Sequence, residues 1–218
     1  MVAAAAAALA APGASAAKGA PAGAIRGTVL VDTGGVAAGV YLTGGPEVDE
    51  KDQRYRPQQY LMRQHNLIFE PGWIIIRVGD SVRFPNDDGA TDHSVFSPHE
   101  KYGFDLHMSN GGPGKKREFT HAGEYDIRCS IHQQMKATIL VVKSLYVTQS
   151  NAKGEFVLEG VPPGEYTLHA WLPDRVEVEQ PVVVVAGKST DGATLVFKRP
   201  RKPREYPTAD KRSYGDRY

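Results

Sequence analysis

Residues 124–142 read EYDIRCSIHQQMKATILVV, a strand-loop-strand pattern whose loop carries several side chains that can bind a metal. The strand-like run 124–128 leads into the loop CSIHQQM, and the run after it, MKATILVVKS, has a strongly β-branched centre. The loop contains the only cysteine of the chain, Cys129, followed by His132 and Met135 at intervals of three residues. Thiolate, imidazole and thioether groups are ligands of soft metals, so the loop is a candidate metal site. A buried, inert cysteine beside unrelated loop residues is the alternative.

The composition of the chain favours an all-β protein. Its 218 residues include 23 Gly and 15 Pro, turn signals recur throughout, and long helical periodicities are absent. This length is enough for one or two small domains with cores of their own. The 26 Lys and Arg residues balance the 25 Asp and Glu residues, which gives no reason to expect nucleic acid or a membrane surface as a partner. No stretch beyond the start approaches the ~18 apolar residues of a membrane span.

Local patterns predict where individual strands and loops lie. Residues 25–44 form a strand-turn-strand unit with the turn at Gly34 and Gly35. Residues 46–60 are a polar loop, and Gly79-Asp80 is a turn between the strands IIIRV and SVRF. The segment 87–116 is a long polar loop, and REFTHAGEYDIRC at 117–129 is a hairpin with Gly123 in its turn.

A redox copper site needs one more ligand than the loop supplies. Fast electron transfer requires a site that changes little between Cu(I) and Cu(II), and two imidazoles, a thiolate and a weak thioether provide it. The second imidazole must come from another rigid loop, and His93 is the best candidate because it follows a strand that ends in FPN. We therefore predict one copper ion bound by His93, Cys129, His132 and Met135. Zinc accepts the same ligand types, but it prefers stronger ligands than thioether.

These residues carry a resemblance to the cupredoxins, the type I (blue) copper proteins. The spacing C-x2-H-x2-M is similar to that of amicyanin. The runs VGDSVRFPN, DHSVFS and FTHAGEYDIRCSIHQQMKATILVV resemble plastocyanin-like domains, best the methylamine-utilisation-like group, over roughly residues 61–143. The resemblance implies a Greek-key β-sandwich and a one-electron carrier. It also implies that His132 is the surface electron port, with Ile131, Gln133 and Gln134 as the contact patch for a redox partner protein of unknown identity.

The chain departs from the cupredoxin pattern around the remote histidine. Many cupredoxins carry Asn directly after it, where it ties the two ligand loops together, whereas this chain has Ser94. We expect the Ser94 hydroxyl to do similar work. One residue more than expected lies between Asn86 and His93, so His99 is the rival ligand. We prefer His93 because the VFS run after it resembles the family and can form a strand edge.

The remaining histidines show no spacing that predicts a second metal site; they are His65, His107, His121 and His169. The adjacent pair His107-Met108 suits Cu(I) and raises the idea of copper delivery, with a loop histidine and a gap-filling methionine as the alternative. No paired-histidine copper cluster and no acid-base pair accompanies the site, so we expect no enzymatic activity.

A second resemblance covers the stretch GEFVLEGVPPGEYTLHAW at 154–171, which is similar to the carboxypeptidase regulatory-like fold, a small transthyretin/Ig-like β-sandwich. That fold usually begins with a hairpin, and residues 27–29 and 37–42 look like it. We expect residues 24–45 and 144–198 to form this sandwich, interrupted by a cupredoxin domain at 46–143. The alternative is a single cupredoxin that uses 25–44 as its first strands, followed by a separate C-terminal module.

The two ends of the chain predict its location. Residues 1–16 resemble a signal peptide, with a cleavage pattern at Ala14-Ser15-Ala16, although no Lys or Arg precedes the apolar run. A true start upstream of Met1 would account for this, and a disordered Ala/Gly/Pro tail is the alternative. Residues 199–218 are basic, rich in proline and predicted to be disordered. We expect a periplasmic or secreted protein, where a bound metal would protect the lone thiol of Cys129. Copper sequestration without electron transfer, or a purely structural exported role, are the alternative functions.

Overall fold

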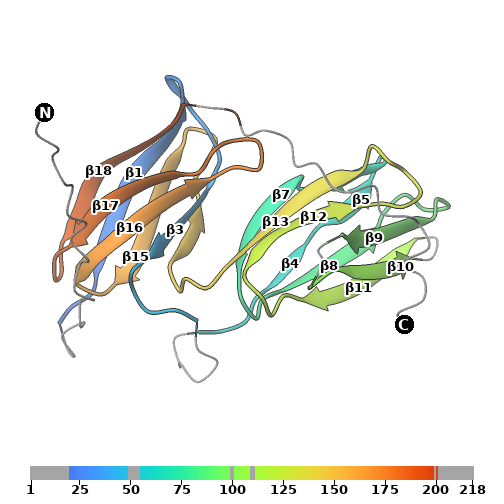
Figure 1. Cartoon of the computed structure of the whole chain (residues 1–218), viewed down its shortest axis with the longest axis horizontal. Helices are drawn as coiled ribbons and strands as arrows, with labels where there is room; N and C mark the ends of the chain where they lie inside the picture. Colours follow the sequence, from blue (N-terminus) through green and yellow to red (C-terminus); the bar gives the residue numbers. More distant parts are fainter. Residues whose placement is uncertain (1–19, 49–54, 99–100, 109–110, 199, 201–218) are drawn as a thin grey trace, which may run out of the picture.

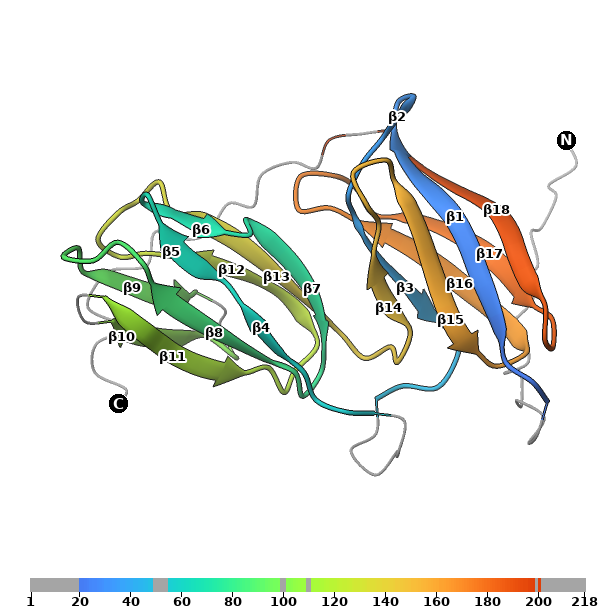
Figure 2. The ribbon, with the colours of Figure 1, turned by 180° about the vertical axis from the view of Figure 1, so that it is seen from behind.

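The computed structural model describes residues 20–48, 55–98, 101–108, 111–198 and 200. All regular elements in these ranges are β-strands, which confirms the all-β expectation. Figures 1 and 2 show two lobes side by side, each built from two facing sheets. Within the described ranges, no helix has the length and apolar character needed to cross a bilayer. The signal-peptide-like segment 1–16, His99 and the tail 199–218, apart from Pro200, lie outside the described residues.

The first lobe combines strands from both ends of the chain. Its strands are β1 (Gly23–Val31), β2 (Gly34–Gly35), β3 (Gly39–Thr43), β14 (Val147–Gln149), β15 (Glu155–Val161), β16 (Gly164–Trp171), β17 (Val178–Val184) and β18 (Ser189–Phe197). One sheet has the order β15-β1-β18, with β2 paired to β1, and the other has the order β14-β3-β16-β17. β1 runs antiparallel to β15 and parallel to β18. β1 therefore pairs with β2 and with two strands beyond residue 146, and β3 pairs with two strands beyond residue 146.

Alternation of side chains builds the core of this lobe. In β15, Phe156 and Leu158 are buried, whereas Glu155, Val157 and Glu159 are exposed, which is the period of two that a half-buried strand requires. The buried side chains of β15 pack with apolar residues from β1, β3, β16, β17 and β18. The two sheets thus enclose one apolar core.

The second lobe contains the segment between these two parts of the chain. Its strands are β4 (Gln59–Leu61), β5 (Arg63–His65), β6 (Ile68–Glu70), β7 (Trp73–Arg77), β8 (Ser81–Asn86), β9 (His93–Ser97), β10 (Phe104–Met108), β11 (Gly112–Glu118), β12 (Gly123–Arg128) and β13 (Lys136–Val142). One sheet has the order β10-β9-β12-β13-β7, and the other has the order β11-β8-β5-β6 with β4 paired to β8. The loop CSIHQQM joins β12 to β13, two central strands of the first of these sheets.

Strand β13 is buried on both faces, which explains its continuous apolar sequence. Ile139 and Val141 point into the core of the second lobe. Leu140 and Val142 belong instead to a separate cluster with Trp171 of the first lobe. β13 therefore joins the core of its own lobe to the junction between the lobes.

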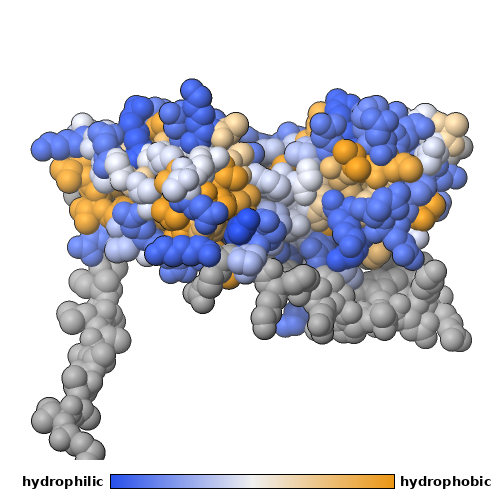
Figure 3. Space-filling model, turned by 90° about the horizontal axis from the view of Figure 1, so that it is seen from above, coloured by the Kyte–Doolittle hydropathy of each residue, from blue (hydrophilic) through white to orange (hydrophobic). Residues whose placement is uncertain are grey.

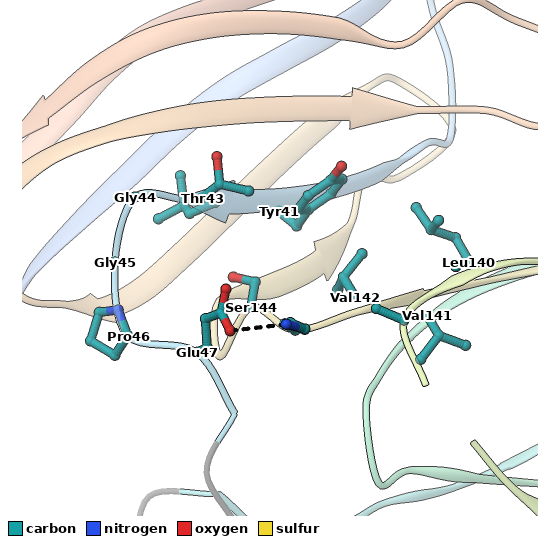
Figure 4. A pocket seen from close by; sticks show the side chains of 14 residues that line it. Tyr41, Thr43, Gly44, Gly45, Pro46, Glu47, Leu140, Val141, Val142 and Ser144 are labelled. Atoms are coloured by element: carbon teal, nitrogen blue, oxygen red, sulfur yellow. Dashed lines mark ion pairs between the residues drawn. The ribbon is translucent and has the colours of Figure 1, made fainter. Parts of the chain in front are cut away.

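Two tryptophans anchor that junction. The rings of Trp73 and Trp171 meet edge to face with centroids 5.7 Å apart. The Trp171 Nε1–H donates a hydrogen bond of 3.1 Å to Glu124 Oε2, so a polar contact accompanies the apolar ones. Beside this contact lies a groove of about 300 Å³, shown in Figure 4, with an ion pair of 3.6 Å between Glu47 and Lys143 in its wall. On the face shown in Figure 3, both lobes carry hydrophilic areas with apolar patches between them.

Three local expectations were wrong. Gly34 and Gly35 form the short strand β2, and the turn lies at residues 32–33, where Asp32 has a φ of 54°. The long segment 87–116 is not a loop throughout, because β9, β10 and most of β11 form within it by pairing with β12, β9 and β8. The segment 117–129 is not a hairpin. β11 pairs with β8 and β12 pairs with β13, so the chain crosses from one sheet to the other around the buried Phe119.

Candidate metal centre

Cys129 follows the last residue of β12 and is buried, with 4% of its surface exposed. Its thiol is free. The Ser94 amide N–H points at Cys129 Sγ from 3.5 Å, and His132 Nδ1 lies 3.8 Å from the same sulfur. The sulfur of Cys129 therefore lies between one amide donor and the imidazole of His132.

His93 begins β9 and is completely buried. Its Nδ1 lies 3.2 Å from His132 Nδ1, and its Nε2 lies 2.9 Å from Asp88 Oδ2. A carboxylate accepts a proton donor, so the Nε2–H of His93 faces Asp88 and the Nδ1 lone pair faces Cys129 and His132. The carboxylate thereby fixes both the tautomer and the ring orientation that a metal ligand needs.

Asp88 is in turn held by the hairpin turn between β5 and β6. The amide N–H of Asn66 donates to Asp88 Oδ1 at 2.6 Å, and that of Leu67 donates to Oδ2 at 3.0 Å. Burial alone would raise the pKa of the Asp88 carboxyl, but the hydrogen bonds from Leu67, His93 and Asn66 outweigh it and lower the pKa. Asp88 thus stays an anion beside His93. Sequence reasoning missed this residue.

The loop after Cys129 contributes the other two predicted ligands. The Met135 amide N–H donates to the His132 carbonyl at 3.0 Å, which closes the loop into a tight turn. His132 is partly buried, and Met135 is completely buried in the apolar cluster that also contains Cys129. The donor atoms of His93, Cys129 and His132 all lie within 4.8 Å of one another. Three of the four predicted ligands are therefore brought together, and the fourth lies in the same core.

Ser94 joins the two ligand-bearing segments. Its Oγ accepts a 2.8 Å hydrogen bond from the Ser130 amide and lies 2.7 Å from Ser130 Oγ. Ser94 is next to His93 and Ser130 is next to Cys129, so these bonds fix the two ligands relative to each other. The expected tie between the loops is present, made by a serine.

The donor set fits a soft or borderline metal ion. An ion about 2.0 Å from each nitrogen and about 2.3 Å from sulfur can bridge nitrogens up to about 4 Å apart and a sulfur-nitrogen pair up to about 4.3 Å apart. The observed separations of 3.2 Å between His93 and His132 and 3.8 Å between Cys129 and His132 are within these limits. Imidazole and thiolate suit copper or zinc, and they do not suit magnesium or calcium.

The other histidines have different surroundings. His65 lies 3.9 Å from Asp88 Oδ1, and His121 stacks on Tyr102 with centroids 3.9 Å apart. His107 is exposed on β10, opposite Ser94 in the strand register. His169, for which the sequence offered no partner, lies with Glu177 and Glu179 in a second group of ligand-type side chains.

Comparison with known proteins gives weak likenesses. No protein-family model and no curated protein sequence matches the chain. Among solved structures, a Cu(I) form of a mutant amicyanin is 22% identical, covers 38% of this chain and 80% of its own, and has a TM-score of 0.35. A reduced form of another amicyanin mutant is 24% identical, with 37% and 79% coverage and the same TM-score. Because these scores are low, the chemistry of the site rests on the distances given above.

Proposed function

We propose that this protein is a type I copper protein that carries single electrons, with copper bound by His93, Cys129, His132 and Met135. The observation that carries the proposal is the convergence of two imidazole nitrogens and one sulfur, from two separate segments, within 4.8 Å. Copper, when bound, would supply a one-electron couple at this position. The buried Met135 has the side chain expected of a weak axial ligand.

The hydrogen bonds around the ligands favour electron transfer over sequestration. Asp88 fixes the ring of His93, and Ser94 fixes the loop of Cys129 to the strand of His93. A site held in this way by the protein changes little when the charge of the ion changes, which is what fast electron exchange requires. A sequestering site would need no such restraint.

The surface beside His132 supports contact with a redox partner. Ile131 is 49% exposed, and Gln133 and Gln134 are also exposed. An apolar residue flanked by uncharged amides suits a transient contact that must separate again. The partner protein is defined here only by this chemistry. The balanced charge of the chain gives no support to nucleic acid as a partner, and no catalytic constellation supports an enzyme.

We also propose that the second lobe is a cupredoxin domain, residues 46–143, inserted into a carboxypeptidase regulatory-like sandwich formed by residues 24–45 and 144–198. The pairing of β1 with β15 and β18 supports this organisation. The bridge between Glu47 and Ser144 supports it too, because it brings the two ends of the insert together. The alanine-rich start supports a periplasmic or secreted location.

The test is the spectrum of the purified full chain with Cu(II). We expect an intense blue band and narrow copper hyperfine splitting, both abolished in Cys129→Ser and both retained in His107→Ala. The second variant is the matched control, because His107 is exposed on β10 and outside the proposed ligand set. A pale spectrum with ordinary hyperfine splitting would sink the type I assignment. A blue protein that shows no reversible electrode response would leave copper sequestration as its function.

A further inference from the structure

A second group of ligand-type side chains lies on the sheet β14-β3-β16-β17 of the first lobe. His169 of β16 is opposite Tyr41 of β3 on one side and opposite Glu179 of β17 on the other. Side chains of directly paired residues stand on the same face of a sheet, so these three share one face. Glu177, just before β17, completes the group.

Two carboxylates converge on one nitrogen of His169. Nδ1 lies 2.8 Å from Glu177 Oε1 and 3.8 Å from Glu179 Oε1. Ligand atoms of all three residues lie within 4.8 Å of one another. An ion about 2.0–2.2 Å from nitrogen and oxygen can bridge atoms up to about 4.3 Å apart. The side chain of Glu179 is 64% exposed, so it has the freedom to adjust to an ion.

The imidazole of His169 is held in place before any ion arrives. The ring stacks on Tyr41 at a centroid distance of 4.6 Å and an interplanar angle of 9°. Its Nε2 lies 2.8 Å from Thr43 Oγ1. Because a carboxylate only accepts, the Nδ1–H of His169 donates to Glu177 Oε1, and Nε2 accepts from the Thr43 hydroxyl. An ion that binds at Nδ1 would replace this proton, as metal binding to a histidine requires. Only 7% of His169 is exposed, so the ring has little freedom to turn away.

Charge in the group also favours a cation. Two carboxylates face one imidazole in the group, and carboxylate oxygens are ligands that attract a cation. Tyr41 OH donates to Glu177 Oε1 at 2.5 Å. Burial and the neighbouring carboxylate of Glu177 raise the pKa of Tyr41, so its hydroxyl stays neutral. The side chain of Glu177 is 33% exposed, and an ion can therefore reach the group from solvent.

We propose that His169, Glu177 and Glu179 form a second metal site that binds a borderline divalent cation of the Zn²⁺ or Cu²⁺ class. One imidazole with two carboxylates is a ligand combination that Zn²⁺ uses, whereas Cu(I) prefers sulfur, and Mg²⁺ and Ca²⁺ prefer oxygen alone. Tyr41 and Thr43, which contact His169, also line the groove between the lobes, so the group lies near that groove (Figure 4). The site shares no residue with the proposed copper centre.

The test uses the full chain carrying Cys129→Ser and His132→Ala, which removes two ligands of the first site. Zn²⁺ is titrated against a chromophoric chelator, and we expect one ion per chain. Loss of even a supporting partner of a ligand weakens metal affinity about 10–100-fold, so Glu179→Gln is expected to weaken it by at least about tenfold. Glu165→Gln, an exposed carboxylate on β16 outside the group, is the matched control and should change the affinity less than about twofold.

A spectroscopic measurement identifies the ligand atom. Zn²⁺ should shift the Nδ1 resonance of His169 in a ¹⁵N-histidine spectrum, with the assignment taken from His169→Gln. Absence of Zn²⁺ binding in the double variant would overturn the proposal. Equal affinities for Glu179→Gln and Glu165→Gln would overturn it as well. Neither result bears on the blue-copper assignment, which is read from the spectrum of the unmodified chain.

Discussion

Replacing Asp88 by alanine tests whether a carboxylate outside the proposed ligand set positions the proposed copper site. The side chain accepts three hydrogen bonds, from the amides of Asn66 and Leu67 and from the Nε2 of His93. Asp88→Ala removes all three while leaving every proposed ligand in the chain. We therefore expect the variant to fold, to lose part of its stability and to bind copper more weakly.

The size of the effect depends on which of the three donors water can reach. Asn66 and Leu67 are exposed, so water replaces the carboxylate at their amides at little net cost. The side chain of His93 is 0% exposed, so its Nε2–H is left without an acceptor. Such an unsatisfied buried donor costs about 1–3 kcal/mol of unfolding free energy. Loss of the carboxylate behind a ligating histidine typically lowers metal affinity about 10–100-fold.

The matched control is Asp87→Ala. Asp87 is the adjacent residue, and its carboxylate pairs with Arg63 at 2.7 Å on the surface, where such a pair contributes about 0–1 kcal/mol. Unfolding of both metal-free variants by urea gives the stability loss, and competition for Cu(I) with a colorimetric chelator gives the affinity. Cu(I) is the suitable probe because it avoids the carboxylates of the second site. Equal Cu(I) affinities for the two variants would refute the role of Asp88.

Three further substitutions test other parts of the structure. Ser94→Ala removes the bonds to Ser130 and should lower the unfolding free energy of the metal-free chain by about 0.5–1.5 kcal/mol in urea, and Ser94→Asn should recover part of it. Leu67→Gly relieves a φ of 59° in the hairpin turn after Asn66 and should raise the melting temperature, because the strain of about 1–2 kcal/mol exceeds the added entropy of glycine, about 0.5–1 kcal/mol. Trp171→Ala should cost about 3–5 kcal/mol and split thermal unfolding, followed by calorimetry, into two transitions, because Trp171 is central to the junction; a single unshifted transition would contradict this.

Much of the fold follows from short-range patterns in the sequence. The alternation of Phe156 and Leu158 with exposed residues predicts β15, and the β-branched run at 136–142 predicts β13. The segment 87–116 was mistaken for a loop because its strands carry glycine, lysine and histidine and pair at the margins of their sheets. The supposed hairpin at 117–129 failed for a different reason. Two consecutive strands joined at a glycine have the same sequence pattern whether they pair with each other or belong to two different sheets.

The sequence predicted that His93, Cys129 and His132 come together, and it predicted the residues that hold them only in part. Cys129 and His132 share one short loop, and Ser94 stood out by comparison with the cupredoxin pattern. Asp88 is one of several acidic residues before His93, and only the folded strand shows which of them meets the imidazole. No site was predicted at His169, because Glu179 meets it through the pairing of β16 with β17 and not through a short sequence motif. Contacts across strands need the register, which the sequence alone does not provide.

Strand order explains why ligands separated in sequence meet at one place. β9, β12 and β13 are neighbours in one sheet, and β9 runs antiparallel to β12. The start of β9 and the end of β12 therefore lie at the same end of the sheet. His93 is the first residue of β9, and Cys129 follows the last residue of β12. Neighbouring strands are about 4.8 Å apart, a spacing that matches the separations of ligands around one ion. The backbone itself thus sets the dimensions of the site, and the same reasoning places His169 beside Glu179 on β16 and β17. In both groups the sheet sets the distance between the side chains, and the chemical type of the side chains decides which metal ion they can bind.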